Sequence, residues 1–182
     1  MSNVDHPKHY NFAPLEVITI IDRFNMNFYI GNIFKYVARH LHKSKPIEDL
    51  EKALWYAERY LEKFKRDKQK ELDDPKSVEY TTREFDYKSN NYKDLQTDFL
   101  DFYEQETNGY DIIKHIFNLY DISYAFNKSL EYKGTINQIV IIVTISTLQE
   151  IVNLLKQEIR YIILEHIQER NDEIAKLYKK LQ

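Results

Sequence analysis

Glycine, proline and cysteine are scarce in this chain. Its 182 residues include three glycines, four prolines and no cysteine, whereas glycine alone usually makes up about 7% of a protein. P-loops and dinucleotide-binding turns need closely spaced glycines, but Gly31, Gly109 and Gly134 lie far apart. The glycine-flanked serine of an α/β-hydrolase is excluded for the same reason. Because cysteine is absent, disulfides, thiolate nucleophiles and cysteine-ligated metal sites are excluded too.

Targeting and membrane segments are also not evident. Residues 1–10 are polar and lack the apolar core of a signal peptide. The most apolar run, residues 139–145, is much shorter than the roughly 20 residues that span a bilayer. We therefore expect a soluble, cytoplasmic protein without a membrane partner.

Charge is nearly balanced but unevenly distributed. The formal net charge of −3 argues against DNA as a partner, because the phosphate backbone selects for strongly basic surfaces. Bases outnumber acids over residues 35–70, and acids dominate over residues 71–106. This gradient predicts either a local anion site in the first third or attraction between the two parts of the chain.

The spacing of apolar residues predicts an all-α fold, because few breakers interrupt a period of three and four. In the first part we expect helices over residues 16–24, 32–43 and 46–64, the last two forming an αα-hairpin. Asn32, beside the permissive Gly31, is the expected N-cap of the second helix. Pro46 and the acids after it suit the first turn of the third.

Beyond this hairpin the sequence changes character. We predict three parts: a helical domain over residues 1–64, a polar linker or wrap over 65–93, and a helical bundle over 94–182 with a long terminal helix. The helices expected in the last part cover residues 94–107, 110–132 and 136–181. Because residues 139–146 are rich in β-branched side chains, an isolated strand is the alternative there.

The long terminal helix carries two apolar seams. The first passes through Ile145, Leu148, Val152, Leu155, Ile159 and Ile162. The second passes through Ile163, Ile167, Ile174, Leu177 and Leu181. A seam that shifts sideways is typical of a helix that packs first within a bundle and then against another subunit, so we predict a homo-oligomer formed through this helix.

Three cations four residues apart are the most suggestive feature of the second helix. Lys35, Arg39 and Lys43 are expected on one side of it. The opposite, buried stripe is expected to consist of Ile33, Val37 and Leu41. Near the helix N-terminus such a row resembles a phosphate clamp, and the competing interpretation is a solvated helix face.

Histidines, acids and aromatic residues nearby each have two interpretations. His6 and His9 could bind a metal or exchange protons, but two ligands do not make a site, so no metal site is predicted. The sequence leaves any cofactor unknown. Glu48 and Asp49 could serve as a base or bind a metal, although the helix dipole and an ion pair to Lys52 already explain them.

Trp55 and Tyr56 could stack on a base. The alternative, and the one we expect for Trp55, is packing beside the core stripe.

These residues together carry a resemblance. The pattern reads His6-Pro7-x-His9-Tyr10, then Glu16-Val17, Gly31-Asn32-x-x-Lys35-Tyr36-x-x-Arg39, Lys43, and Glu48-Asp49-Leu50-x-Lys52-Ala53-x-x-Tyr56-x-x-Arg59. In order, spacing and chemistry, residues 5–61 resemble the SaV-like phage domain, long catalogued as a domain of unknown function, whose relatives include a podophage nucleotide kinase without a P-loop. The resemblance implies a phage-type nucleotide-binding protein of the host-cell cytoplasm, and a candidate deoxynucleoside monophosphate kinase for dTMP- or dGMP-like acceptors.

The resemblance also implies which residues form the site. The implied catalytic group is His6, His9, Lys35, Arg39, Glu48 and Asp49. The implied nucleotide-binding group is Tyr10, Gly31, Asn32, Tyr36, Lys43, Lys52, Tyr56 and Arg59. By analogy the cations hold phosphoryl oxygens, the histidines contact phosphate or base, and the acids orient the acceptor or a metal. Relatives usually have glycine just before the Glu16 position, where this chain has Ala13, Pro14 and Leu15.

Two other functions stay open. A non-catalytic nucleotide-binding module, whose C-terminal part engages a host or phage protein, would explain why that part shows no catalytic pattern. A metal-dependent all-α pyrophosphohydrolase would use Glu48 and Glu51, but a matching second acidic pair is not evident.

Overall fold

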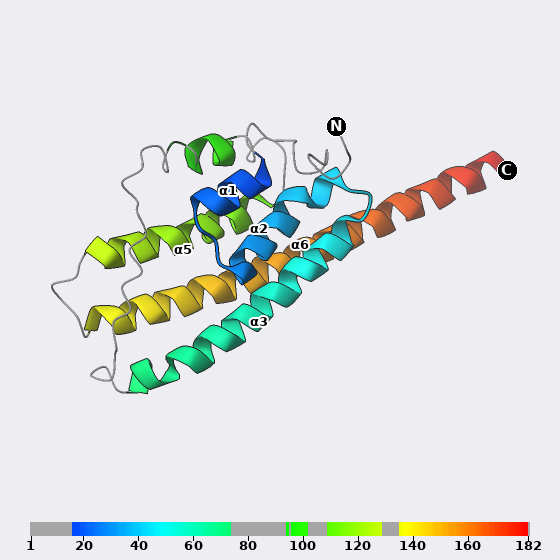
Figure 1. Ribbon diagram of the computed structural model, residues 1–182. Helices are drawn as coiled ribbons and strands as arrows, with labels where there is room; N and C mark the ends of the chain where they lie inside the picture. The colour runs from blue at the N-terminus through cyan, green and yellow to red at the C-terminus, as the bar shows by residue number, and fades with distance from the viewer. Residues whose placement is uncertain (1–15, 74–93, 95, 102–108, 129–134, 182) are drawn as a thin grey trace.

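The fold is helical throughout the residues that the computed structural model describes, which are 16–73, 94, 96–101, 109–128 and 135–181 (Figure 1). The elements are α1 (Val17–Arg23), α2 (Phe28–Arg39), the 3-10 turn η2 (His40–His42), α3 (Pro46–Asp73), α5 (Tyr110–Lys128) and α6 (Thr135–Leu181). Residues 94 and 96–101 are helical as well. The predicted all-α class is confirmed, and the described residues contain no strand, so residues 139–146 are helix.

A connected core joins the first and second parts of the chain. α6 runs beside α3 and α5, and α2 lies against α3 (Figure 1). The ring of Phe117 on α5 packs 4.9 Å from Phe24 and 5.8 Å from Phe34, between centroids. An ion pair of 2.7 Å between Lys156 on α6 and Glu58 on α3 ties the two long helices at their edge.

α1 packs closely on α2 because α2 carries a glycine at the contact. The chain turns between them through Asn25, whose φ of 44° lies in the left-handed region that asparagine tolerates. A Cβ added to Gly31 would lie 3.3 Å from Cγ2 of Ile21. Gly31 therefore serves helix packing, which the sequence alone did not reveal.

The predicted bounds of α2 are wrong at both ends. Asn27, not Asn32, is the N-cap, because its side-chain oxygen accepts hydrogen bonds from the amides of Tyr29 (3.0 Å) and Ile30 (3.1 Å). The α-helix ends at Arg39, and η2 then changes the angle between successive side chains. As a result His40 is fully buried, whereas Leu41, expected in the core, is 46% exposed.

α3 is longer than its apolar stripe predicts. It continues through residues 65–73, the start of the expected linker, which corrects that boundary. Polar pairs one turn apart stabilise this extension: Lys63 with Asp67, and Gln69 with Asp73 at 2.9 Å. The division of the chain into three parts otherwise stays a prediction, and residues 74–93 lie outside the described residues.

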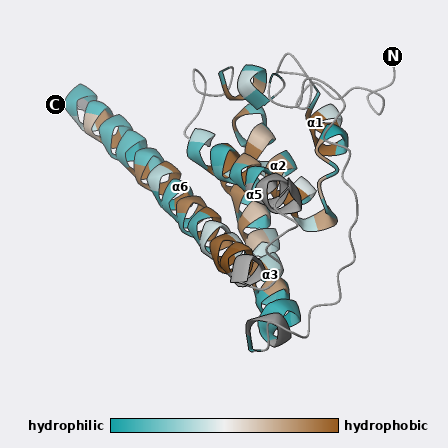
Figure 2. Ribbon diagram, turned by 90° about the vertical axis from the view of Figure 1, so that its left-hand side faces the viewer, coloured by the Kyte–Doolittle hydropathy of each residue, from teal (hydrophilic) through white to brown (hydrophobic). Residues whose placement is uncertain are grey.

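α6 has a buried part and a free end. The first predicted seam is confirmed, since Leu148, Val152, Leu155 and Ile162 are buried while Ile145 and Ile159 pack against the core. Beyond Ile162 every residue whose side chain is described is exposed. In Figure 2 the ribbon is brown beside α3 and mostly teal, with brown patches, toward the C-terminus.

The apolar character of α6 is more extensive than the run at 139–145 suggested. Within the described residues, Ile139–Lys180 is the one helix long and apolar enough to cross a membrane by length and composition, with a most apolar window of mean hydropathy 1.7, of which 28% is buried. The buried share faces α3 and α5, so packing in the bundle accounts for that part of the apolar sequence.

Candidate functional site

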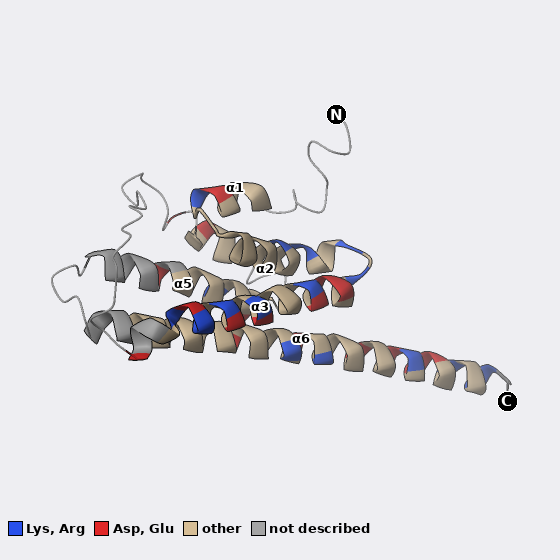
Figure 3. Cartoon of the chain, turned by 60° about the horizontal axis from the view of Figure 1, so that its bottom comes forward, with Lys and Arg blue, Asp and Glu red and all other residues tan. Residues whose placement is uncertain are grey.

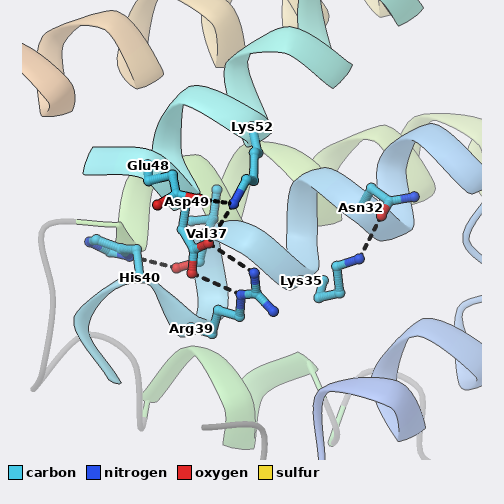
Figure 4. Close-up of polar contacts among 8 residues, drawn as sticks. All are labelled: Asn32, Lys35, Val37, Arg39, His40, Glu48, Asp49 and Lys52. Carbon is cyan, nitrogen blue, oxygen red and sulfur yellow. Dashed lines mark hydrogen bonds and ion pairs between the residues drawn. The ribbon is translucent and has the colours of Figure 1, made fainter. Parts of the chain in front are cut away.

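A buried ion pair joins the end of α2 to the first turn of α3. Nε and Nη2 of Arg39 donate to the two carboxylate oxygens of Asp49, each at 2.8 Å (Figure 4). The two side chains are 9% and 3% exposed. This bidentate geometry is the strong, directional form of the contact between arginine and a carboxylate. It fixes the angle between the two helices on which the remaining site residues lie.

Three cationic groups surround the ring of Tyr36 on α2. Measured to the ring centroid, Nζ of Lys35 lies at 4.4 Å, Cζ of Arg39 at 4.6 Å and Nζ of Lys52 at 5.9 Å. Tyr56 on α3 stacks on the same ring, with centroids 6.0 Å apart. A ring face attracts cations, so Tyr36 helps to hold like charges close together.

The two lysines differ in their electrostatic setting. Nζ of Lys35 donates to Oδ1 of Asn32 at 2.6 Å, and burial, followed by the nearby guanidinium of Arg39, lowers its pKa. A bound anion would reverse that shift by favouring the charged amine.

Lys52 forms the predicted ion pair with Glu48, with its Nζ 2.6 Å from Oε1 of Glu48. That hydrogen bond raises the pKa of Lys52. Together with the contact to Lys45, it lowers the pKa of Glu48 to about 2.

His40 is a buried histidine that sequence reasoning did not single out. Its Nδ1 donates to the carbonyl of Val37 at 2.7 Å, and burial lowers its pKa. Its Nε2 is buried without a hydrogen-bond partner in the described part of the chain. Burial therefore favours the neutral form of the ring, which lies directly after the ion-paired Arg39. The position of His40 directly after Arg39 was the only feature of the sequence that could have pointed to this histidine.

Two exposed rings extend the site along α2 and α3. Phe28 is 68% exposed and Trp55 is 55% exposed. Both meet Tyr56 edge to face, at centroid distances of 5.7 and 4.9 Å. Trp55, which was expected to pack beside the core stripe, is instead largely exposed, since it lies one residue outside the buried residues of α3. Phe28 was not identified from the sequence because this helix was expected to begin at residue 32, whereas α2 begins at Phe28.

The structure brings most of the expected residues together. On one α2–α3 face lie Asn32, Lys35, Tyr36, Arg39, Glu48, Asp49, Lys52 and Tyr56. Lys43 lies exposed in the bend after η2, and the guanidinium of Arg39 is paired with Asp49. The predicted row of three cations along one helix is therefore not formed. The helix N-terminus that was expected beside Gly31 lies at Asn27 and is capped.

Other expected residues lie at the edge of this face or apart from it. Arg59 lies at the edge, over the ring of Trp55 and 5.4 Å from its centroid. Gly31 lies apart, buried at the α1 contact. His6, His9 and Tyr10 fall outside the described residues, as do Ala13, Pro14 and Leu15.

Residues 4–58 match DUF3310, a family described as a protein of unknown function. The matched region covers under a third of the chain and nearly coincides with the extent of the resemblance noted from the sequence. It includes all of α1 and α2 and the first part of α3, hence the whole ion-paired face. No curated protein and no solved structure matches the chain.

In chemical terms the site combines amines, an amide and aromatic rings. Lys35 and Lys52 offer donors to an anion, while Phe28 and Trp55 offer exposed ring surface. Among the described residues, no three His, Asp or Glu side chains are grouped so that they could hold a metal ion. The arrangement suits a ligand that carries both an anionic group and a flat ring.

Proposed function

We propose that the α2–α3 face binds a nucleotide. The observation that carries the proposal is the gathering of two lysine amines around the stacked Tyr36 and Tyr56, next to two exposed aromatic rings. We call this set, Phe28, Lys35, Tyr36, Lys52, Trp55 and Tyr56, the cation–aromatic face. A nucleotide is a ligand class that presents phosphate and a stackable base together.

The lysines are the proposed phosphate contacts. Lys35 and Lys52 come from different helices, and the side chain of Lys52 is 41% exposed. Each could exchange its present partner, Asn32 or Glu48, for a phosphate oxygen, which is a more highly charged acceptor. Arg39 and Asp49 are buried and make their hydrogen bonds to each other. In this proposal they do not contact the phosphate but hold α2 and α3 together, and so position the two lysines.

The exposed rings are the proposed base contacts. A base stacked on an aromatic side chain gains about 1–3 kcal/mol. Phe28 and Trp55 leave more than half of their surfaces exposed, and both contact Tyr56, so a base could stack on them beside the two lysines. Arg59 above Trp55 adds a further cation at the edge of this surface.

The resemblance to the SaV-like phage domain supports a stricter form of the proposal. In that form the chain is a phage-encoded deoxynucleoside monophosphate kinase of the host-cell cytoplasm, which transfers a phosphoryl group to a dTMP- or dGMP-like acceptor. Such an enzyme must neutralise phosphates of donor and acceptor, for which the face offers Lys35 and Lys52. The alternative is a non-catalytic module that binds the nucleotide at the same face.

The test compares two matched lysines on α3. Lys52 and Lys63 each pair with an acid one turn away, but only Lys52 lies near Tyr36. Calorimetry with dTMP, dGMP and ATP should show binding by the unchanged protein and by Lys63→Met, with a loss of about tenfold or more for Lys52→Met. Equal affinities for both variants, or no binding of any of these nucleotides, would reject the proposal.

A phosphoryl-transfer assay then separates the two forms. Incubation with ATP and each monophosphate should yield the diphosphate if the stricter form holds, and Lys35→Met should abolish the product while its melting temperature stays close to that of the parent. Binding without product formation would favour the non-catalytic module.

A further inference from the structure

The C-terminal part of α6 leaves the bundle with an apolar stripe that nothing in the described structure covers. Beyond Ile162 every side chain described is exposed, and Figure 1 shows this end of α6 extending past the other helices. Four apolar side chains occupy heptad core positions there: Ile163, Ile167, Ile174 and Leu177, with exposed fractions of 39%, 51%, 49% and 59%. Arg170 occupies the remaining core position between them. Leu164 and Tyr178, at 65% and 68%, flank the stripe. We call residues 163–181 the free end of α6.

Charge is segregated along the free end. Its first half carries Glu165, Glu169, Asp172 and Glu173 with a single base, Arg170, and its second half carries only bases, Lys176, Lys179 and Lys180. Figure 3 shows both signs along this part of the helix. A helix whose two halves have opposite charge is complementary to a second copy of itself that runs in the opposite direction, and repels a copy that runs in the same direction.

We propose that the free end of α6 pairs with the same segment of a second copy in an antiparallel coiled coil. In such a pair an a-position residue packs against a d-position residue of the other helix. With Ile167 at position a and Leu177 at position d, each of these faces the other across the pair. Leu164 then lies level with Tyr178 of the second copy, so the flanking apolar residues are covered as well.

The same register lays the acidic half of each helix alongside the basic half of the second copy. Glu169 lies nearly level with Lys176 of the second copy, and Glu165 with Lys180, on the outer faces of the pair. The attraction therefore acts between the charged halves, and by symmetry it occurs twice. The two bundles lie at opposite ends of the paired segment, since α6 leaves each bundle only after Ile162, so they do not collide.

A second copy explains the free end better than a lipid surface does. A helix that lies on an anionic membrane usually has basic residues along its whole polar face. Here acids occupy half of it, and the acidic and basic halves nearly balance. This inference uses a surface separate from the cation–aromatic face and does not depend on the proposed nucleotide.

The experiment measures the oligomeric state of the full chain by sedimentation equilibrium. The unchanged protein should form dimers at micromolar concentration. The variants Glu165→Lys/Glu169→Lys and Lys176→Glu/Lys180→Glu should each weaken self-association by about fivefold or more, because like-charged halves then lie alongside each other and exposed charges act weakly one by one. The variant that combines all four changes should dimerise again, since its two halves are once more opposite in charge.

Crosslinking then tests the direction of the pair. Because the chain has no cysteine, Leu164→Cys and Tyr178→Cys each introduce a unique thiol. A short thiol-specific crosslinker should join a Leu164→Cys chain to a Tyr178→Cys chain in a mixture, and should not join Tyr178→Cys chains to each other. The residues changed are exposed, and circular dichroism checks that the variants remain folded.

Three outcomes would overturn the inference. They are a monomer at every concentration, a dimer that is indifferent to the charge changes, and a dimer that crosslinks Tyr178→Cys to itself. A monomer that sediments with phosphatidylserine vesicles through the free end would identify a lipid surface as the occupant instead.

Discussion

The buried pair of Arg39 and Asp49 should behave unlike any ion pair on the surface of this protein. Both side chains are nearly inaccessible, at 9% and 3% exposure, and share two hydrogen bonds of 2.8 Å. Removing one partner leaves the other charge in a poorly solvated place, which typically costs about 3–5 kcal/mol. Because a whole domain is stable by only about 5–15 kcal/mol, either single change should lower the midpoint of urea unfolding substantially.

The two single changes should not be equal. Nζ of Lys52 lies 3.9 Å from Oδ1 of Asp49, so Asp49 keeps a cation nearby when Arg39 is replaced. We expect Arg39→Met to cost about 3 kcal/mol and Asp49→Leu closer to about 5 kcal/mol, within the usual range for a broken buried pair.

The double variant distinguishes burial of charge from loss of packing. Arg39→Met/Asp49→Leu removes both charges and keeps apolar volume, so its stability should lie within about 1 kcal/mol of the parent or above it. Urea unfolding of all four proteins gives a coupling energy, which these magnitudes place at about 7 kcal/mol or more. The exposed pair of Lys63 and Asp67 is the control, and Lys63→Met should cost at most about 1 kcal/mol. Single changes at Arg39 and Asp49 that cost as little as this control would refute the reasoning.

Three further predictions follow from the same region. Gly31→Val should destabilise the protein by about 1–3 kcal/mol through overpacking against Ile21, whereas in Gly31→Ala the gain in helix propensity of about 1 kcal/mol should offset the 3.3 Å contact; equal unfolding midpoints for the two variants would contradict this. Glu48, with its pKa lowered to about 2, stabilises the fold above its unfolded pKa and loses that contribution as pH falls toward 2. In Lys52→Ala, carbon-detected NMR titration should find the pKa of Glu48 raised, and an unchanged value would show that the ion pair is not the cause. Because burial lowers the pKa of His40, stability should be complete above the unfolded value of about 6.5 and fall as pH decreases below it; His40→Gln should flatten that decline, and the same slope in both proteins would assign it elsewhere.

The helical class of the fold and the length of α6 could be predicted from the sequence because they depend on local periodicity. The stripe of α3 and the first seam of α6 repeat every three or four residues, and burial of one face of a helix is sufficient to produce such a pattern. The extension of α3 to Asp73 was missed because it is stabilised by polar pairs on an exposed surface, such as Gln69 with Asp73, which leave no apolar signal.

The candidate site was located by the sequence but was assembled differently by the structure. Lys35, Tyr36, Lys52 and Tyr56 come together as expected from two adjacent helices. Spacing alone placed Arg39 in a row with Lys43, because a sequence pattern cannot show that a carboxylate from the next helix captures the guanidinium. The position of Trp55 was missed for a related reason, since an aromatic residue beside a stripe packs inward or outward according to the neighbouring helix.

The sequence by itself therefore determined the scarcity of turns, the all-α class and the charge gradient. Only the tertiary structure decided that Gly31 serves helix packing, that Arg39 and Asp49 neutralise each other, and that the free end of α6 has no partner within the described chain. Helix periodicity and composition are properties of neighbouring residues, whereas ion-pair partners and covered faces depend on how distant helices are brought together.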